Sequence, residues 1–125
     1  PLVEIISYAD AANDSRWFTT APSKVLPIAL QRANLDLSQI DLIEINEAFS
    51  VVALANLKIM GINPDIVNVN GGAVSLGHPL GCSGARIVVT LIHALNKRKL
   101  KRGAAIVCNG GGGASAIVIE SIKKS

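Results

Sequence analysis

Short apolar runs alternate with longer amphipathic stretches along the chain, and glycine or proline marks many of the boundaries between them. Apolar runs of about four to eight residues predict buried strands, whereas longer periodic stretches predict helices. We therefore expect strands at residues 2–9, 41–46, 67–70, 104–108 and 114–120. Helices are expected between them, at residues 24–34, 47–60 and 85–96.

The predicted order is β-α-β-α-β-α-β-β. Alternating strands and helices are typical of an α/β fold, in which right-handed crossovers make the sheet mostly parallel. The turn at residues 109–113 is too short for a crossover, so the last two strands should pair antiparallel. The prediction is one domain over residues 1–125, with a mixed five-stranded sheet and helices on both faces.

The helix expected at residues 85–96 has a central stretch, residues 87–92, that is apolar on every side. A helix of this kind lies inside a large core or a membrane. No apolar run reaches the roughly eighteen residues that a membrane span needs. A single small sheet cannot cover every side of this helix, so we expect a second layer from further chain or from a partner.

Composition narrows the class of protein. Half of the residues are hydrophobic and 17% are charged, which excludes a disordered chain. The formal net charge is +3, and much of the basic excess lies in Lys97, Arg98, Lys99, Lys101, Arg102, Lys123 and Lys124. Without interleaved aromatic residues, this cluster indicates a solvated helix end rather than a nucleic-acid interface, although it could attract a phosphorylated substrate. The two cysteines favour a reduced, intracellular protein over a disulfide scaffold.

Three polar residues follow predicted strands. Asn46 ends the second strand, His78 lies in the glycine-rich loop after the third, and Cys108 ends the fourth. In parallel α/β sheets, functional groups gather at the carboxyl ends of the strands. We expect these residues to share one edge of the sheet and to form an acid/base site.

His78 and Cys108 are the candidates for proton transfer. His78 lies in a rigid Gly-His-Pro setting, which favours a base or hydrogen-bond donor over a histidine that satisfies loop carbonyls. Four glycines follow Cys108 and Asn109, and their N–H groups can face a ligand, whereas the alternative is an inert buried thiol. A lowered pKa would make Cys108 a nucleophile or an acid/base. Cys82 is interpreted as a small packing residue and His93 as a structural histidine. Neither glycine-rich loop has the spacing of a nucleotide-binding loop.

Three sequence blocks resemble the thiolase family. They are Asn46-Glu-Ala-Phe49, then Gly71-Gly-Ala-Val-Ser-Leu-Gly-His-Pro79 continued by Gly81-Cys-Ser-Gly-Ala-Arg86, and Cys108-Asn-Gly-Gly-Gly-Gly-Ala-Ser115. They occur in the family's order and spacing, and the similarity covers essentially the whole chain. The resemblance is to the C-terminal half of a short-chain, acetoacetyl-CoA type of thiolase, so the fold is expected to be half of a thiolase.

The resemblance implies a role for each matching residue. His78 would activate a nucleophilic cysteine and donate to the thioester oxyanion, and Cys108 would take the α-proton of acetyl-CoA. Asn46 would hold a water that completes the first oxyanion hole. The Gly110 N–H would help to form the second, and Phe49 would line the acyl pocket.

The implied reaction is the condensation of two acetyl-CoA to acetoacetyl-CoA and CoA, and the reverse thiolysis. The family's nucleophilic cysteine lies in an N-terminal thiolase domain that this chain lacks, so we expect the chain alone to be inactive and its exposed helix to cause self-association. The expected partners are that domain, the CoA thioesters and further copies in a homodimer or homotetramer, with neither nucleic acid nor membrane. No cofactor is required, but Val74 matches a position that binds potassium in some mitochondrial members. The protein would be mitochondrial in a eukaryote and cytoplasmic in a bacterium.

Three alternatives stay open. A longer-chain 3-ketoacyl-CoA thiolase would share these blocks, because the residues that select chain length lie mostly outside them. A non-catalytic acyl-CoA- or lipid-binding relative is disfavoured by the intact Asn46, His78 and Cys108. Another condensing enzyme of the same fold, such as a ketoacyl synthase or a hydroxymethylglutaryl synthase, is disfavoured by the cysteine base.

Overall fold

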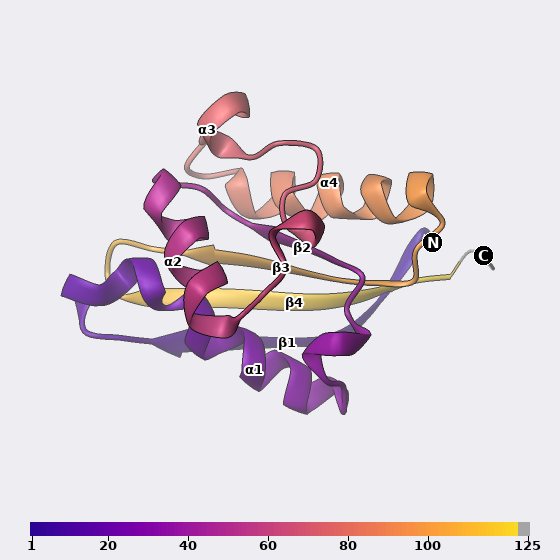
Figure 1. Ribbon diagram of the computed structural model, residues 1–125, viewed down its shortest axis with the longest axis horizontal. Helices are drawn as coiled ribbons and strands as arrows, with labels where there is room; N and C mark the ends of the chain where they lie inside the picture. The colour runs from indigo at the N-terminus through magenta and orange to yellow at the C-terminus, as the bar shows by residue number, and fades with distance from the viewer. Residues whose placement is uncertain (123–125) are drawn as a thin grey trace.

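The computed structural model describes residues 1–122, so Lys123 and Lys124 of the basic cluster lie outside the described residues. A four-stranded sheet lies between helices on its two faces (Figure 1). Its strands are β1 (Val3–Ala12), β2 (Leu42–Ile45), β3 (Arg102–Cys108) and β4 (Gly113–Ser121). The α-helices are α1 (Pro22–Ala33), α2 (Ser50–Met60), α3 (Ala73–Leu76) and α4 (Ser83–Arg98), and short 3-10 helices are η1 (Ser15–Thr20), η2 (Leu37–Gln39) and η3 (Pro64–Ile66).

The strand order is β1-β4-β3-β2, and the sheet is mixed. β3 and β4 pair antiparallel, as predicted from their short turn. The prediction of a mostly parallel sheet is wrong, because β1 pairs antiparallel with β4, and only β2 and β3 are parallel among the described strands. The chain leaves β1 at one edge, passes through α1 and enters β2 at the other edge, so the first two strands never become neighbours.

The strand expected at residues 67–70 is absent, so the predicted five-stranded sheet has four strands. Only one isolated bridge joins Val67 to Ile43. Asn68 then adopts a left-handed φ of 48°. Its side-chain oxygen accepts from the Ile45 N–H at 2.9 Å, and its amide nitrogen donates to the Ile45 carbonyl at 2.9 Å. The side-chain amide takes the place of a backbone partner, which ends the pairing after one residue.

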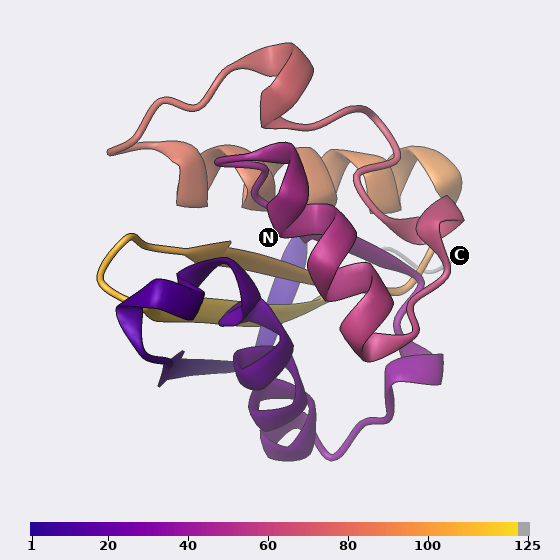
Figure 2. The same ribbon diagram turned by 60° about the vertical axis from the view of Figure 1, so that its left-hand side comes forward.

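Each face of the sheet is covered by its own helix, as expected. α1 packs over β1, β4 and β3, whereas α4 packs over β3 and β2 on the opposite face (Figure 2). Strand side chains alternate between these faces. In β2, Leu42 packs with the α4 side and Ile43 with the α1 side.

α4 sits close to the sheet. A Cβ at Gly103 of β3 would lie 2.7 Å from the Leu91 side chain, so only glycine permits this approach. Ile87 and Leu91 are buried there, whereas Val89 on the same helix is 53% exposed. α4 therefore keeps an apolar side beyond its sheet contact. Within residues 1–122, no helix is long and apolar enough to cross a membrane.

Candidate active site

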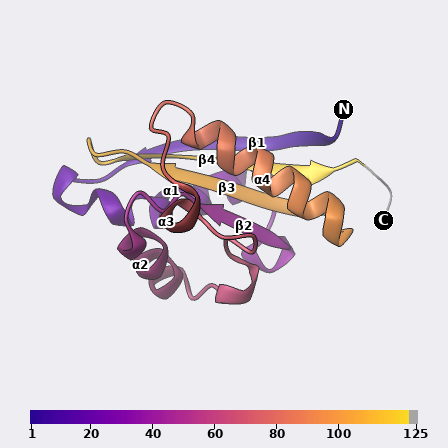
Figure 3. The same ribbon diagram turned by 90° about the horizontal axis from the view of Figure 1, so that it is seen from above.

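The three predicted site residues lie at one edge of the sheet. The Asn46 N–H continues the parallel pairing of β2 and donates to the Ile106 carbonyl of β3 at 2.9 Å, and β3 itself ends at Cys108. α4 runs back over the sheet and begins above the end of β3, so the loop with His78 reaches the same edge (Figures 1 and 3). Within residues 1–122, no hydrogen bond directly joins the side chains of Asn46, His78 and Cys108.

His78 is half-buried and is anchored through one ring nitrogen. Its Nδ1 lies 2.5 Å from Oγ of Ser83, the first residue of α4. Ser83 is itself 1% exposed, and its hydroxyl donates to the Pro79 carbonyl at 3.1 Å. The ring is thus held by the helix start and not by the loop alone.

Cys108 is buried in the core on the α1 side of the sheet, next to its β4 partner Ala114. Burial raises the pKa of the Cys108 thiol above its usual 9.0. The sulfur therefore carries its proton at neutral pH. This direction is the opposite of that in an activated nucleophile and is the one that suits a proton donor.

The turn after Cys108 is shaped by Asn109 and by one glycine. The Asn109 side-chain oxygen accepts from the Gly111 N–H at 3.0 Å and from the Gly113 N–H at 3.2 Å. Gly112 has a φ of +97°, and a Cβ there would lie 2.3 Å from the Asn13 carbonyl. Gly110 has open space around it, and its N–H has no partner among the described residues. That N–H is free to meet a ligand.

The Asn46 side chain is buried to 1% exposure, yet within residues 1–122 neither of its polar atoms has a hydrogen-bond partner. Buried amides in native proteins are nearly always bonded to protein, water or ligand. Asn46 thus offers an NH2 group as donor and a carbonyl oxygen as acceptor at the edge of the sheet.

Glu44, two residues before Asn46, is a charged residue that the sequence reasoning missed. It is 1% exposed, and its Oε2 lies 3.6 Å from Nη1 of Arg86 on α4. Burial raises the pKa of Glu44 to about 7, while Arg86 lowers it and Glu47 adds to the rise. All four residues of β2 are buried. A carboxylate within such a short apolar run is the sequence feature that could have pointed to a buried charge.

Glu47 ties the end of β2 to the loop that carries His78. Its Oε1 accepts from the Asn68 amide at 2.9 Å, and its Oε2 accepts from the Val74 N–H at 3.0 Å. A Cβ on Gly72 would lie 2.4 Å from this carboxylate, so a side chain at residue 72 would displace the Glu47 carboxylate from these hydrogen bonds. Among the described residues, no group of three or more His, Cys, Asp or Glu side chains could hold a metal ion, and a potassium site at Val74 stays a prediction.

Phe49 is a further site candidate, and it is accessible, as are Cys82 and His93, which the sequence did not mark as site residues. Phe49 is 59% exposed at the start of α2 and stacks edge-to-face on Phe18 with ring centroids 6.3 Å apart. Its free face can contact a ligand. Cys82 is exposed, so the expectation that it is a packing residue is wrong. His93 is exposed on α4.

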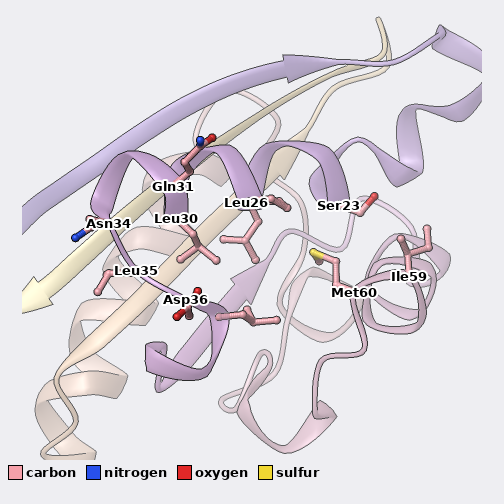
Figure 4. Close-up of a pocket in the computed structure, with 11 residues that line it drawn as sticks. Ser23, Leu26, Leu30, Gln31, Asn34, Leu35, Asp36, Ile59 and Met60 are labelled. Atoms are coloured by element: carbon pink, nitrogen blue, oxygen red, sulfur yellow. The ribbon is translucent and has the colours of Figure 1, made fainter.

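A separate groove of about 690 Å³ lies away from this edge, between α1, the chain before η2 and the end of α2 (Figure 4). Leu26, Leu30 and Met60 point into it, and none of the predicted site residues lines it. The chemistry and this groove therefore belong to different parts of the molecule.

Comparisons with known proteins agree on one family. The family model described as "Thiolase, C-terminal domain" matches residues 1–121. Acetyl-CoA acetyltransferase 2 of Arabidopsis thaliana is 62% identical over 119 residues, which cover 95% of this chain and 30% of that protein. The chain thus spans about a third of the length of the curated relatives it matches.

Solved structures show the same fold. A thiolase of Ascaris suum in complex with coenzyme A is 51% identical, with a TM-score of 0.91 over 98% of this chain and 31% of that one. Human mitochondrial 3-ketoacyl-CoA thiolase is 39% identical, with a TM-score of 0.95 over 98% of this chain and 31% of that one. An acetyl-CoA acetyltransferase of Bacillus anthracis matches with a TM-score of 0.96 at 43% identity. The backbone therefore does not distinguish acetyl-CoA acetyltransferases from 3-ketoacyl-CoA thiolases.

Proposed function

This chain belongs to the thiolase family, in which it forms the C-terminal domain, and we propose that it is the C-terminal catalytic half of an acetyl-CoA acetyltransferase. The reaction would be the condensation of two acetyl-CoA to acetoacetyl-CoA and CoA, together with its reverse. The observation that carries this proposal is a 62% identical relative of that name, aligned over 95% of a chain that retains Asn46, His78 and Cys108.

Cys108 would move the proton at the α-carbon. In condensation, the Cys108 thiol must first release its proton to solvent, and the thiolate that results takes a proton from acetyl-CoA. The raised pKa of Cys108 makes that thiolate a stronger base. The resulting carbanion attacks the acetyl group held on a nucleophilic cysteine. The new C–C bond forms as that cysteine leaves as a thiolate. In thiolysis the Cys108 thiol returns the proton to the departing carbanion, and the raised pKa of Cys108 keeps that proton available.

His78, Asn46 and Gly110 would stabilise the charge on the reacting oxygens. His78 also takes the proton of the nucleophilic thiol when the acetyl-enzyme forms. The unpartnered Asn46 amide, buried at the end of β2, can hold a water for one oxyanion. The free Gly110 N–H can donate to the other, and losing one such donor typically costs about 10²–10³ in rate.

The proposal requires partners. An N-terminal thiolase half would supply the nucleophilic cysteine, since Cys82 lies at the start of α4 in a different motif. Acyl-CoA is the substrate class, and Phe49 would contact the acyl group. A homodimer or homotetramer is the expected assembly. Relatives are named as cytosolic and as mitochondrial, so an intracellular enzyme is proposed without a choice of compartment.

The test compares the full-length enzyme that carries this chain with residues 1–125 alone. The full-length enzyme should cleave acetoacetyl-CoA with CoA, and should do so faster than it cleaves a long-chain 3-ketoacyl-CoA. Residues 1–125 alone should not turn over either substrate. A preference for the long substrate would favour the 3-ketoacyl-CoA thiolase, and turnover of neither by the full-length enzyme would favour a binding protein.

A further inference from the structure

We propose that Ser83 sets the tautomer of His78, holding the ring proton on Nδ1 and leaving the Nε2 lone pair free for chemistry. Ser83 would be a positioning residue, because it acts through His78. The tautomer follows from the geometry alone, whereas its catalytic consequence rests on the proposed function.

The Ser83 hydroxyl lies between the His78 ring and the Pro79 carbonyl. Ser83 Oγ lies 2.5 Å from His78 Nδ1 and 3.1 Å from the Pro79 carbonyl. A hydroxyl carries one proton, and a carbonyl can only accept. When Ser83 donates to Pro79, only its lone pairs face the ring, so the proton of the short contact must come from Nδ1.

The opposite tautomer satisfies the same atoms less well. If Nδ1 carried no proton, the Ser83 hydroxyl would have to donate to it, and Ser83 Oγ would face the Pro79 carbonyl with no proton between them. Ser83 is 1% exposed, so water cannot readily relieve that contact. The Pro79 carbonyl has two lone pairs, and it can accept from Ser83 as well as from the Cys82 N–H at 2.7 Å.

The backbone around Ser83 keeps this arrangement in place. The Cys82 N–H bond to Pro79 closes the turn after His78, and the Arg86 N–H donates to the Cys82 carbonyl at 2.9 Å as α4 begins. Ser83 lies between these two bonds in the first turn of a sixteen-residue helix. A hydroxyl held this way can fix a ring orientation, because the partner of one ring nitrogen decides which nitrogen carries the proton.

The inferred tautomer allows His78 to perform both proposed roles without turning its ring. Neutral His78 presents the Nε2 lone pair and can take the proton of the nucleophilic thiol. The imidazolium that results presents Nε2–H and can donate to an oxyanion. In the neutral ring and in the imidazolium alike, the proton stays on Nδ1 and is donated to Ser83 Oγ.

The test combines a spectroscopic and a kinetic readout on the full-length enzyme. Magic-angle-spinning 15N spectra of the histidine-labelled enzyme report which ring nitrogen is protonated, and a His78→Gln variant identifies the His78 signals. We expect a protonated Nδ1 in the wild type and in Ser83→Thr, and a shift toward protonated Nε2 in Ser83→Ala. Ser75→Ala is the control, because the Ser75 hydroxyl donates to the Gly72 carbonyl at the start of α3, just before His78, and not to His78.

The kinetic result should follow the tautomer. Ser83→Ala should lower kcat about tenfold with little change in KM, which is less than the loss of a whole general base, and Ser83→Thr should restore most of the rate. A protonated Nε2 in the wild type would overturn the proposal, as would a Ser83→Ala enzyme with unchanged 15N spectra and unchanged kcat. If the wild type does not turn over acetoacetyl-CoA, the proposed function fails, but the spectra still decide the tautomer.

Discussion

Glu44 is the residue whose environment departs furthest from what its neighbours in sequence suggest. It lies in the short buried strand β2, between Ile43 and Ile45, and faces Arg86 on α4. Asn46 and Cys108 were predictable from the sequence because each ends an apolar run, where a strand of the sheet stops. The partners Glu44–Arg86 and His78–Ser83 were not, because each pair forms only when α4 docks on the sheet or begins its first turn.

Glu44 should make the stability of the fold depend on pH. Its pKa is about 7 in the folded protein against an ordinary 4.5, so the folded state holds this proton more tightly than the unfolded chain does. The free energy of unfolding should therefore fall as pH rises from about 4.5 to about 7, by about 3 kcal/mol, and then level off. Urea denaturation across this range measures the fall.

The Glu44→Gln variant isolates this contribution, because glutamine stays neutral and keeps a similar shape. The variant should lose most of the fall in stability, whereas Glu4→Gln, the same change at an exposed position, should keep it. Equal pH dependence in the wild type and in Glu44→Gln would show that Glu44 does not hold its proton in the folded state.

At the scale of elements, the sequence predicted the three longer helices and the last hairpin well, because their periodicity and turn residues are local. It missed the single-turn helix α3, which lies in a segment expected to be a glycine-rich loop. The strand at residues 67–70 failed because the Asn68 side chain bonds to Ile45 in place of a backbone partner. The pairing of β1 with β4 could not be predicted from the sequence either, because the residue pattern of a strand does not specify its neighbour.

The turn at residues 109–113 gives a prediction at this scale. Gly112→Ala should destabilise the fold by about 2–4 kcal/mol, because alanine is strained at a φ of +97° and its Cβ would meet the Asn13 backbone. Gly110→Ala should stay within about 0.5 kcal/mol of the wild type, because its surroundings are open and its N–H is kept. Thermal unfolding of both variants measures the difference, and equal losses would mean that the turn does not have this conformation.

At the scale of the whole molecule, one side of the fold is incompletely covered. A groove of about 270 Å³ runs between α4 and the strands β1 and β4, with Val88 and Ile117 in its lining, and Tyr8 on β1 is 68% exposed. The sequence predicted an apolar side of this helix that a single sheet could not bury. Under the proposed function, the N-terminal half of the enzyme would cover this side and bring its cysteine toward His78.

Under the proposed function, His78 takes the proton of the nucleophilic cysteine, whereas Cys108 moves the proton at the α-carbon. The most direct measurement is made on full-length Cys108→Ala, following CoA release as the acetyl-enzyme forms from acetyl-CoA and, separately, the formation of acetoacetyl-CoA. We expect the acetyl-enzyme to form at close to the wild-type rate, while condensation falls by about 10²–10⁴, the range for loss of a general acid/base. Condensation within a few-fold of the wild type, or an equal loss of both steps, would contradict the account.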